Sequence, residues 1–365
     1  MKKYMFIIPS LSKGGAERVV SILSSELVKK ENAVTIITHF KTEYEYPVNK
    51  GVKIVCLSDM KECTYREKMS ILFLIKLLYI LRKKVKQEDP DYILPFLWTT
   101  CIRAELSLIF SKYNKRIIQT VRNNPSIFPQ NRILRKYRDF LVKKSKMSLV
   151  QNKEQKDYFD FNLKNKIKIL PNPVSEEILN IKRENDNNTI NIIGVGRLEK
   201  QKKFELLIKA FAEISSKNKN VRLKIYGDGT QKENLQKLIN ELQIQDIAKL
   251  CGRANNYSTI YSSASIYVLS SDFEGMPNTL LEAMAVGLPC ISTNCPTGPS
   301  DIIVNGENGL LINRNSISEL IESIEKIIKN EEFREKISKN AKNTIKQKYS
   351  SDMICKMLIE YCEQI

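Results

Sequence analysis

Short apolar runs alternate with amphipathic stretches along the whole chain of 365 residues. The apolar run 3–11 predicts a first buried strand, and two glycines separate it from a stretch at 16–30 in which Val19, Leu23 and Leu27 share one helical face. Further apolar runs and amphipathic stretches follow in the same order. This alternation of strand and helix indicates an α/β protein built on parallel sheets.

The alternation is interrupted at Pro171 and Pro173, then restarts with a strand-like run at 191–198 after a polar stretch. A helix follows in which Phe204 and Phe211 are in phase with the leucines and isoleucines between them. We therefore predict two doubly wound domains. Their ranges are 1–172 and 173–348, with a C-terminal helix at 349–365 that packs back on the first domain. Because ligands lie beyond the carboxyl ends of parallel strands, the expected site is a cleft between the two sheets.

Composition excludes several classes of site. The eight cysteines contain no Cys-x-x-Cys pair and lie mostly in apolar contexts, so we expect reduced, buried thiols. His39 is the single histidine, which argues against a zinc site or a histidine-dependent triad.

The longest later apolar run, 71–81, carries Lys76 at its centre and is shorter than the roughly 20 residues that span a bilayer. The N-terminal run is too short for a signal peptide, so we expect a cytoplasmic location.

The net charge of +18 is unevenly distributed along the chain. Residues 1–180 contain 34 Lys and Arg against 18 Asp and Glu, a net charge of +16, while the remainder carries +2. The segment 101–150 alone has 12 basic and 2 acidic residues. A half this basic indicates an anionic partner or surface, and solvated helices are the plain alternative.

The stretch FEGMPNTLLEAMAVGLP, residues 273–289, places Glu274 and Glu282 on either side of a predicted helix start. Asn278 is a favourable N-cap residue there, and the backbone amides that follow it would form an anion site for a phosphate. Glu282 would accept hydrogen bonds from a vicinal diol. A favourable charge near the positive helix end is its simpler role. Glu274 would meet a polar ligand from the preceding loop.

A second group of candidate residues follows the strand at 191–196. Arg197 and Lys202 lie at the carboxyl edge of that strand, where a guanidinium and an ammonium suit a diphosphate. A solvated basic loop is the alternative, because Lys200 and Lys203 are neighbours. Gly14 and Gly15 after the first strand allow close approach of backbone to a ligand, or merely a tight turn. Neither a strand–GxGxxG–helix fingerprint nor a GxxxxGK[ST] loop is present, which disfavours dehydrogenases and P-loop proteins.

These motifs together resemble glycosyltransferase family 4. The E-x(7)-E pair of Glu274 and Glu282, the segment GRLEKQKKFELLIKAF, the loop KGGAERVV, the linker LPNPV and the strand IYGDG carry the resemblance over essentially the whole chain. It implies the GT-B fold, with two Rossmann-like domains facing across a cleft. It also implies retaining transfer from a nucleotide sugar without a metal or other cofactor, in agreement with the missing Asp-x-Asp motif.

The resemblance also assigns roles to residues. Arg197 and Lys202 would neutralise the donor diphosphate, Glu282 would hold the ribose hydroxyls, and Glu274 would contact the donor sugar. Retention in this family is usually drawn as front-face attack, so Glu274 is not assigned as a nucleophile. The remaining donor contacts fall to Gly15, Arg253 and the backbone amides of Asn278, Thr279 and Leu280.

One position departs from the family pattern. Many members have a histidine after a strand of the first domain that reaches the donor sugar, whereas the stretch IIQTVRNNP has Arg122 there. A fixed cation would pair with a phosphate or a sugar hydroxyl. The segment CPTGPSDII resembles that of members that transfer galactose or N-acetylgalactosamine from UDP-sugars in bacterial surface-polysaccharide assembly.

The basic first half suits such a role. The stretches KLLYILRKKVK and NRILRKYRDFLVKKSK combine apolar and aromatic residues with dense Lys and Arg, as helices on an anionic membrane face do. The expected partners are a UDP-sugar, a polyprenyl-diphosphate-linked glycan acceptor and the inner face of the cell membrane, and no nucleic acid. A soluble or protein acceptor, a catalytically inactive membrane-associated binding module, and an oxidoreductase are the alternatives.

Overall fold

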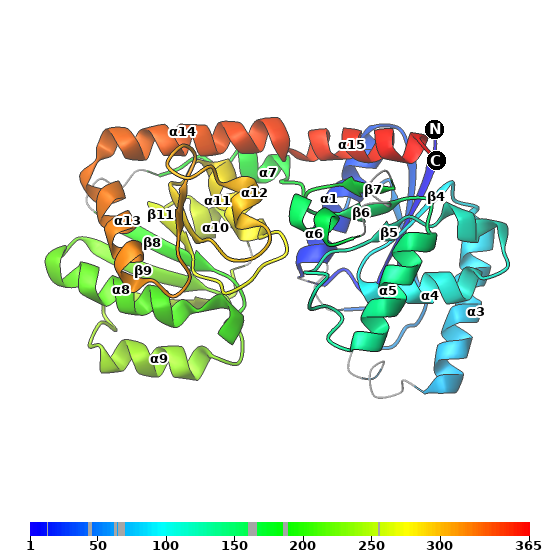
Figure 1. The fold of residues 1–365 in the computed structure, drawn as a ribbon, viewed down its shortest axis with the longest axis horizontal. Helices are drawn as coiled ribbons and strands as arrows, with labels where there is room; N and C mark the ends of the chain where they lie inside the picture. Colours follow the sequence, from blue (N-terminus) through cyan, green and yellow to red (C-terminus); the bar gives the residue numbers. More distant parts are fainter. Residues whose placement is uncertain are drawn as a thin grey trace. The chain divides into compact units, whose positions relative to one another are not determined.

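The computed structural model describes residues 1–12, 14–42, 46–61, 64, 70–159, 166–184, 189–254 and 256–365 (Figure 1). Lys13 of the predicted glycine loop, half of the polar stretch after the linker, and Cys63 lie outside these residues. The chain divides into two compact units. Unit 1 contains residues 1–173 and 351–365, and unit 2 contains residues 174–350.

Unit 1 is built on parallel strands. Its first sheet has the order β3-β2-β1-β4, and a second parallel sheet has the order β5-β6-β7. A parallel bridge from Ile93 to Ile117 connects β4 with the chain just before β5. The strands are β1 (Lys3–Ile8), β2 (Ala33–Thr38), β3 (Val52–Cys56), β4 (Tyr92–Pro95), β5 (Gln119–Thr120), β6 (Ser148–Val150) and β7 (Ile167–Ile169). The strand order therefore reverses between β1 and β4.

Helices cover both faces of the first sheet of unit 1 because side chains alternate along its strands. Phe6 of β1 packs in one apolar cluster with residues of α1 and α15, and the next residue, Ile7, packs in another with residues of α3 and α4. Figure 1 shows α15, in red, beside the blue α1. The helices are α1 (Gly15–Lys29), α3 (Ile71–Glu88), α4 (Trp98–Leu108), η1 (Lys112–Arg116), α5 (Arg132–Lys144), α6 (Lys153–Tyr158) and α15 (Ser351–Glu363).

Unit 2 has a single sheet of six parallel strands in the order β10-β9-β8-β11-β12-β13. Numbered within the unit, this order is 3-2-1-4-5-6, the doubly wound arrangement of nucleotide-binding folds. The strands are β8 (Ile190–Val195), β9 (Val221–Tyr226), β10 (Ala248–Gly252), β11 (Ile266–Leu269), β12 (Cys290–Thr293) and β13 (Leu310–Ile312). The order reverses between β8 and β11, so the carboxyl ends of these two strands form the topological switch point.

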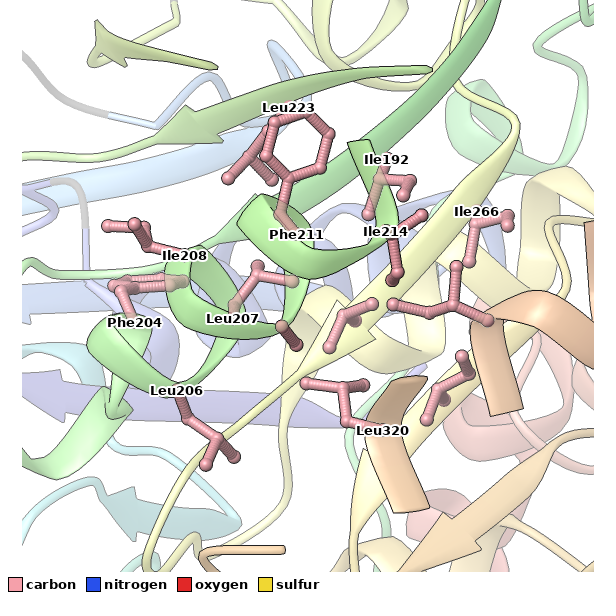
Figure 2. Close-up of a cluster of buried hydrophobic side chains, with 14 of the residues drawn as sticks. Ile192, Phe204, Leu206, Leu207, Ile208, Phe211, Ile214, Leu223, Ile266 and Leu320 are labelled. Carbon is pink, nitrogen blue, oxygen red and sulfur yellow. The ribbon is translucent and has the colours of Figure 1, made fainter. Parts of the chain in front are cut away.

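The predicted helical phase of the second half is confirmed in the core of unit 2. In α8 (Phe204–Lys217), Phe204, Leu207, Ile208 and Phe211 are all buried, and Figure 2 shows this face packed against strand residues such as Leu223. Each large apolar side chain buried in this way stabilises the fold by about 1.5–3 kcal/mol. The other helices are α7 (Glu176–Leu179), η3 (Lys200–Lys202), α9 (Lys232–Glu241), α10 (Tyr257–Tyr261), α11 (Asn278–Val286), α12 (Pro299–Ile302), α13 (Ile317–Lys329) and α14 (Glu331–Lys348).

The single histidine is buried in the core of unit 1. His39 Nδ1 lies 2.7 Å from Arg103 Nη1, and burial, with the nearby guanidinium, lowers the pKa of the imidazole to about 3. His39 is therefore neutral throughout the physiological range. The seven described cysteines are free thiols. Among the described residues, no helix combines the length and apolar composition needed to cross a bilayer.

Candidate active site

The predicted polar residues of unit 2 meet at its topological switch point. β8 ends at Val195 and leads directly to Arg197, and η3 carries Lys202. β11 ends at Leu269, and the loop that follows carries Glu274. Parallel strands deliver these two loops to the same edge of the sheet, which is where ligands bind in doubly wound folds.

Lys202 and Glu274 form a direct ion pair at this edge. Lys202 Nζ lies 2.7 Å from Glu274 Oε1, and the two side chains are 13% and 9% exposed. Ser271 Oγ donates a second hydrogen bond of 2.6 Å to the same carboxylate oxygen. Burial of two ions carries a large desolvation cost, which their mutual attraction offsets. Removal of either partner would therefore leave an uncompensated buried charge. The pair thus fixes both side chains before any ligand binds.

Further hydrogen bonds join the two loops that carry the pair. Gln201 Nε2 donates to the Phe273 carbonyl at 2.6 Å, and Ser270 Oγ donates to the Lys202 carbonyl at 2.8 Å. The Asp272 amide donates to the Gln201 carbonyl at 2.9 Å. These contacts hold the η3 segment against the loop after β11, so the position of the ammonium depends on both loops.

Arg197 differs from Lys202 in its surroundings. It is exposed, and within the described parts of the chain its guanidinium forms no ion pair. Glu199 is nearby, and hydrogen bonds from Thr230, together with the charge of Arg197, lower the pKa of its carboxyl group. Arg197 therefore offers a solvated cation beside the partly buried Lys202, which suits an anion that arrives from solvent.

The helix α11 begins one residue earlier than the sequence suggested. The N-cap position is Pro277, not Asn278, and no side chain caps the helix. Proline fixes its own φ and sits where the cap would, so Asn278 becomes the first helical residue. The Leu280 amide donates to the Pro277 carbonyl at 3.2 Å. The Leu280 amide thus already has an acceptor within the first turn, and the binding of a phosphate by the amides of Asn278, Thr279 and Leu280 stays a prediction.

Glu282 is held in the second turn of α11. Its side chain is buried, with 3% exposure, and Tyr261 donates a hydrogen bond of 2.8 Å to Oε2. Tyr267 and Thr279 share a hydrogen bond of 2.7 Å beside it. Aromatic hydroxyls from α10 and β11 therefore orient this end of the helix. The sequence predicted the carboxylate but not its tyrosine partner.

The glycines of the GDG segment, a weak pattern in the sequence, have a structural reason. Gly227 has φ +148°, and a Cβ atom there would lie 1.7 Å from the Gly196 carbonyl oxygen. Gly229 has φ +158°, and its Cβ atom would lie 2.5 Å from the Leu198 carbonyl oxygen. The loop after β9 therefore presses against the loop that carries Arg197.

The remaining predicted residues lie at three other places. Arg253 follows β10 at the sheet edge, where its Nε lies 3.7 Å from Asp228 Oδ2 and its side chain is exposed. Gly15 and Arg122 belong to unit 1. Gly15 is the first residue of α1 and is exposed, whereas Arg122 follows β5 and is buried.

The chemistry that unit 2 offers follows from these contacts. Two cations and an uncapped helix N-terminus provide donors for an anion, and two buried, oriented carboxylates accept hydrogen bonds from hydroxyl groups. The described residues contain no group of three or more His, Cys, Asp or Glu side chains placed to hold a metal ion.

Two protein-family models and several relatives match this chain. Residues 13–178 match the family model Glycosyltransferase Family 4, and residues 175–344 match Glycosyl transferases group 1. An uncharacterised glycosyltransferase of Haemophilus influenzae is 30% identical over 337 residues, covering 91% of this chain and 92% of the relative. A Campylobacter jejuni alpha-1,4-N-acetyl-D-galactosaminyltransferase, named for the substrate GalNAc-alpha-(1->4)-GalNAc-alpha-(1->3)-diNAcBac-PP-undecaprenol, is 30% identical and covers 95% of this chain and 94% of the relative.

A solved structure shows the same architecture. HepE from Anabaena, crystallised with UDP and glucose, superposes with a TM-score of 0.79 at 14% identity, with all of both chains covered. The predicted GT-B fold, with two Rossmann-like units of parallel strands, is thus confirmed. The sequence relatives and the two family models together show that the chain belongs to glycosyltransferase family 4.

Proposed function

We propose that the chain transfers a hexose or N-acetylhexosamine, of the galactose or N-acetylgalactosamine type, from a UDP-sugar to a glycan acceptor with retention of configuration. The observation that carries this proposal is the Lys202–Glu274 pair at the switch point of unit 2, with Arg197 beside it. The pair places a cation for a diphosphate next to a carboxylate for a sugar hydroxyl. The UDP and glucose bound by HepE support the donor class.

The leaving diphosphate is stabilised by fixed charges in this proposal. The Lys202 ammonium has three N–H donors, and the one it gives to Glu274 leaves others for phosphate oxygens. Arg197 adds a guanidinium, and the N-terminus of α11 adds the helix dipole. These charges do the work that a divalent cation does elsewhere, so we propose that transfer needs no metal and persists in excess chelator.

Glu274 acts as a hydrogen-bond acceptor in this proposal. Lys202 and Ser271 hold its carboxylate in place, and we propose that it accepts a hydrogen bond from a sugar hydroxyl. The acceptor oxygen attacks the anomeric carbon, the bond from that carbon to the diphosphate breaks, and the acceptor proton passes to the leaving phosphate on the same face. His39, buried and neutral, takes no part.

Arg197→Ala is expected to weaken the binding of UDP roughly ten- to hundredfold, because it removes charge-assisted hydrogen bonds to the diphosphate. Isothermal titration calorimetry measures this directly. Arg314→Ala is the matched control, since Arg314 is also exposed and follows β13 of the same sheet. Equal UDP affinity in the wild type and Arg197→Ala would remove Arg197 from the site.

The acceptor is proposed to be a polyprenyl-diphosphate-linked glycan at the cytoplasmic face of the membrane, as in bacterial surface-polysaccharide synthesis. The undecaprenol-linked substrate named for the Campylobacter relative supports this. In unit 1, α3 buries Leu77, Leu81 and Val85 and leaves a row of large apolar side chains exposed. These are Ile71, Leu72, Ile75 and Tyr79, with Lys76, Lys83 and Lys86 also exposed on this helix. Exposed apolar and basic side chains on one helix suit an anionic bilayer.

Binding of the full chain to phosphatidylglycerol vesicles is expected to fall as salt rises, because part of the attraction is charge on charge. Lys83→Gln should weaken the affinity for these vesicles about fivefold, because this is the contribution of one lysine near an anionic surface. Leu72→Ser should also weaken it, whereas Leu242→Ser, an exposed leucine of unit 2, should not. Sedimentation with vesicles measures the bound fraction. Absent or salt-insensitive binding would show that the helix is simply solvated.

A further inference from the structure

A small pocket lies at the carboxyl edge of β4 and β5 in unit 1. Leu97 and Trp98 follow β4, and Thr120, Arg122 and Asn123 lie at the end of β5 and just beyond. The pocket leaves about 20 Å³ for the centres of water-sized atoms. About 10–15 Å³ on this measure holds one water molecule, so the pocket is far too small for a whole substrate. This pocket therefore suits one chemical group of a substrate.

Arg122 is held rigidly at this pocket. Its side chain is 8% exposed, and its guanidinium carbon lies 4.5 Å from the centroid of the Phe96 ring. Nη1 donates to the Leu170 carbonyl at 3.2 Å and lies 3.4 Å from Asn172 Oδ1. One nitrogen and one face of the guanidinium are thus occupied by unit 1 itself.

The other edge of the same guanidinium has no partner. Nε and Nη2 of Arg122 are buried and form no hydrogen bond with any described residue. These two nitrogens point their N–H groups in the same direction and bind the two oxygens of a carboxylate or phosphoryl group in parallel. Buried donors without an acceptor are rare and costly, so an acceptor from outside the described chain is expected there.

The charge of Arg122 is also unbalanced. The residues that line the pocket include no carboxylate, and the second arginine among them, Arg138, is already paired with Asp139 at 2.6 Å. Burial lowers the pKa of the Arg122 guanidinium to about 9. Burial of a cation without a counter-ion is unfavourable, and the binding of an anion would offset that cost.

We propose that Arg122 binds an oxyanion of a substrate, a carboxylate or phosphoryl group, through its Nε and Nη2 edge. This inference rests on the proposed transfer from a UDP-sugar. Three sources carry such a group: the diphosphate of UDP, the carboxylate of an acidic donor sugar, and the diphosphate of a polyprenyl acceptor. Arg122 is then a determinant of substrate specificity in unit 1.

Calorimetry on the full chain with three pairs of probes tests the proposal. UDP is compared with uridine, UDP-galacturonic acid with UDP-galactose, and farnesyl diphosphate with farnesol. In each pair the measured quantity is the ratio of the affinity for the charged probe to the affinity for its counterpart. Arg122→Gln should reduce this ratio roughly ten- to hundredfold in at least one pair, and that pair identifies the source of the oxyanion. Arg122→Lys keeps the charge without the planar fork and should recover only part of the loss. Arg314→Gln, at an exposed arginine of unit 2, is the control.

Unchanged ratios in all three pairs for a folded Arg122→Gln would overturn the proposal and indicate that water satisfies the two donors. If the variants do not fold, crystal structures of the wild type grown with each charged probe test the proposal instead. An oxyanion within hydrogen-bond distance of Nε and Nη2 supports the proposal, and water there with every probe overturns it. UDP binding that depends on Arg197, together with ratios that Arg122→Gln leaves unchanged in all three pairs, would uphold the proposed function and overturn this inference. If the chain did not bind UDP, the proposed function would be contradicted. Farnesyl diphosphate compared with farnesol would still test the role of Arg122.

Discussion

Replacing Glu274 with alanine is expected to lower kcat/KM for sugar transfer by about 10²–10³-fold while leaving UDP binding intact or slightly tighter. The carboxylate is proposed to touch the sugar, so its loss removes an oriented hydrogen bond to the reacting half of the donor. Lys202 loses an anion that competes with the diphosphate, since the two side chains are 2.7 Å apart. Lys202→Ala should have the opposite effect on UDP and weaken its binding. Steady-state kinetics and calorimetry on the same preparations separate the two effects.

The controls for this prediction come from the same region. Glu205 lies 3.6 Å from Lys203, and their side chains are 41% and 32% exposed, so Glu205→Ala removes a surface pair that contributes little to stability. Its kinetics should stay within twofold of the wild type. Glu274→Gln keeps the shape of the side chain and replaces the alanine variant in these measurements if Glu274→Ala unfolds at a low temperature. Transfer by Glu274→Ala at close to the wild-type rate would show that the carboxylate does not contact the substrate.

Gly227→Ala is expected to cost more than about 3 kcal/mol of folding stability and to weaken UDP binding. A Cβ atom at Gly227 would lie 1.7 Å from the Gly196 carbonyl oxygen, and φ is +148°, so the backbone of both loops must move. Gly196 precedes Arg197, so this movement displaces a proposed phosphate ligand. Urea denaturation and calorimetry with UDP measure the two effects.

Gly306→Ala is the matched control for this substitution. Gly306 also has a positive φ, +79°, but a Cβ atom there would meet no atom within 4 Å. Only the backbone cost of about 1–2 kcal/mol is expected, with UDP binding unchanged. If Gly227→Ala were as stable as Gly306→Ala, the close approach of the β8 and β9 loops would not exist in solution.

The sequence predicted those features that depend on local pattern. The phase of Phe204, Leu207, Ile208 and Phe211 identified the buried face of α8, because a helix repeats every 3.6 residues wherever it packs. The alternation of strands and helices likewise predicted doubly wound sheets. The motif around Glu274 and Glu282 carried the family resemblance, which the matching family models confirm.

Contacts between distant segments were not predictable in this way. Lys202 and Glu274 are 72 residues apart, and only the strand order of the sheet brings their loops together. The start of α11 was misplaced by one residue because Asn278 has a high capping preference, whereas the backbone of Pro277 occupies the cap. The family resemblance led us to expect Arg122 where many members have a histidine. Its two unpartnered donors could not be predicted, because the guanidinium is positioned by Phe96 and Leu170, which come from other strands and loops.

The most direct test of the central claim is transfer of labelled sugar by the purified full chain. The chain is incubated with UDP-galactose or UDP-N-acetylgalactosamine and a polyprenyl-diphosphate-linked glycan, with chelator present, and the product is analysed by NMR. We predict that the labelled sugar appears on the lipid-linked glycan in the α configuration of the donor, and that Glu274→Ala loses most of this transfer. The account would be contradicted if no UDP-sugar stabilised the chain or served as a donor. A product with the inverted configuration would also contradict it.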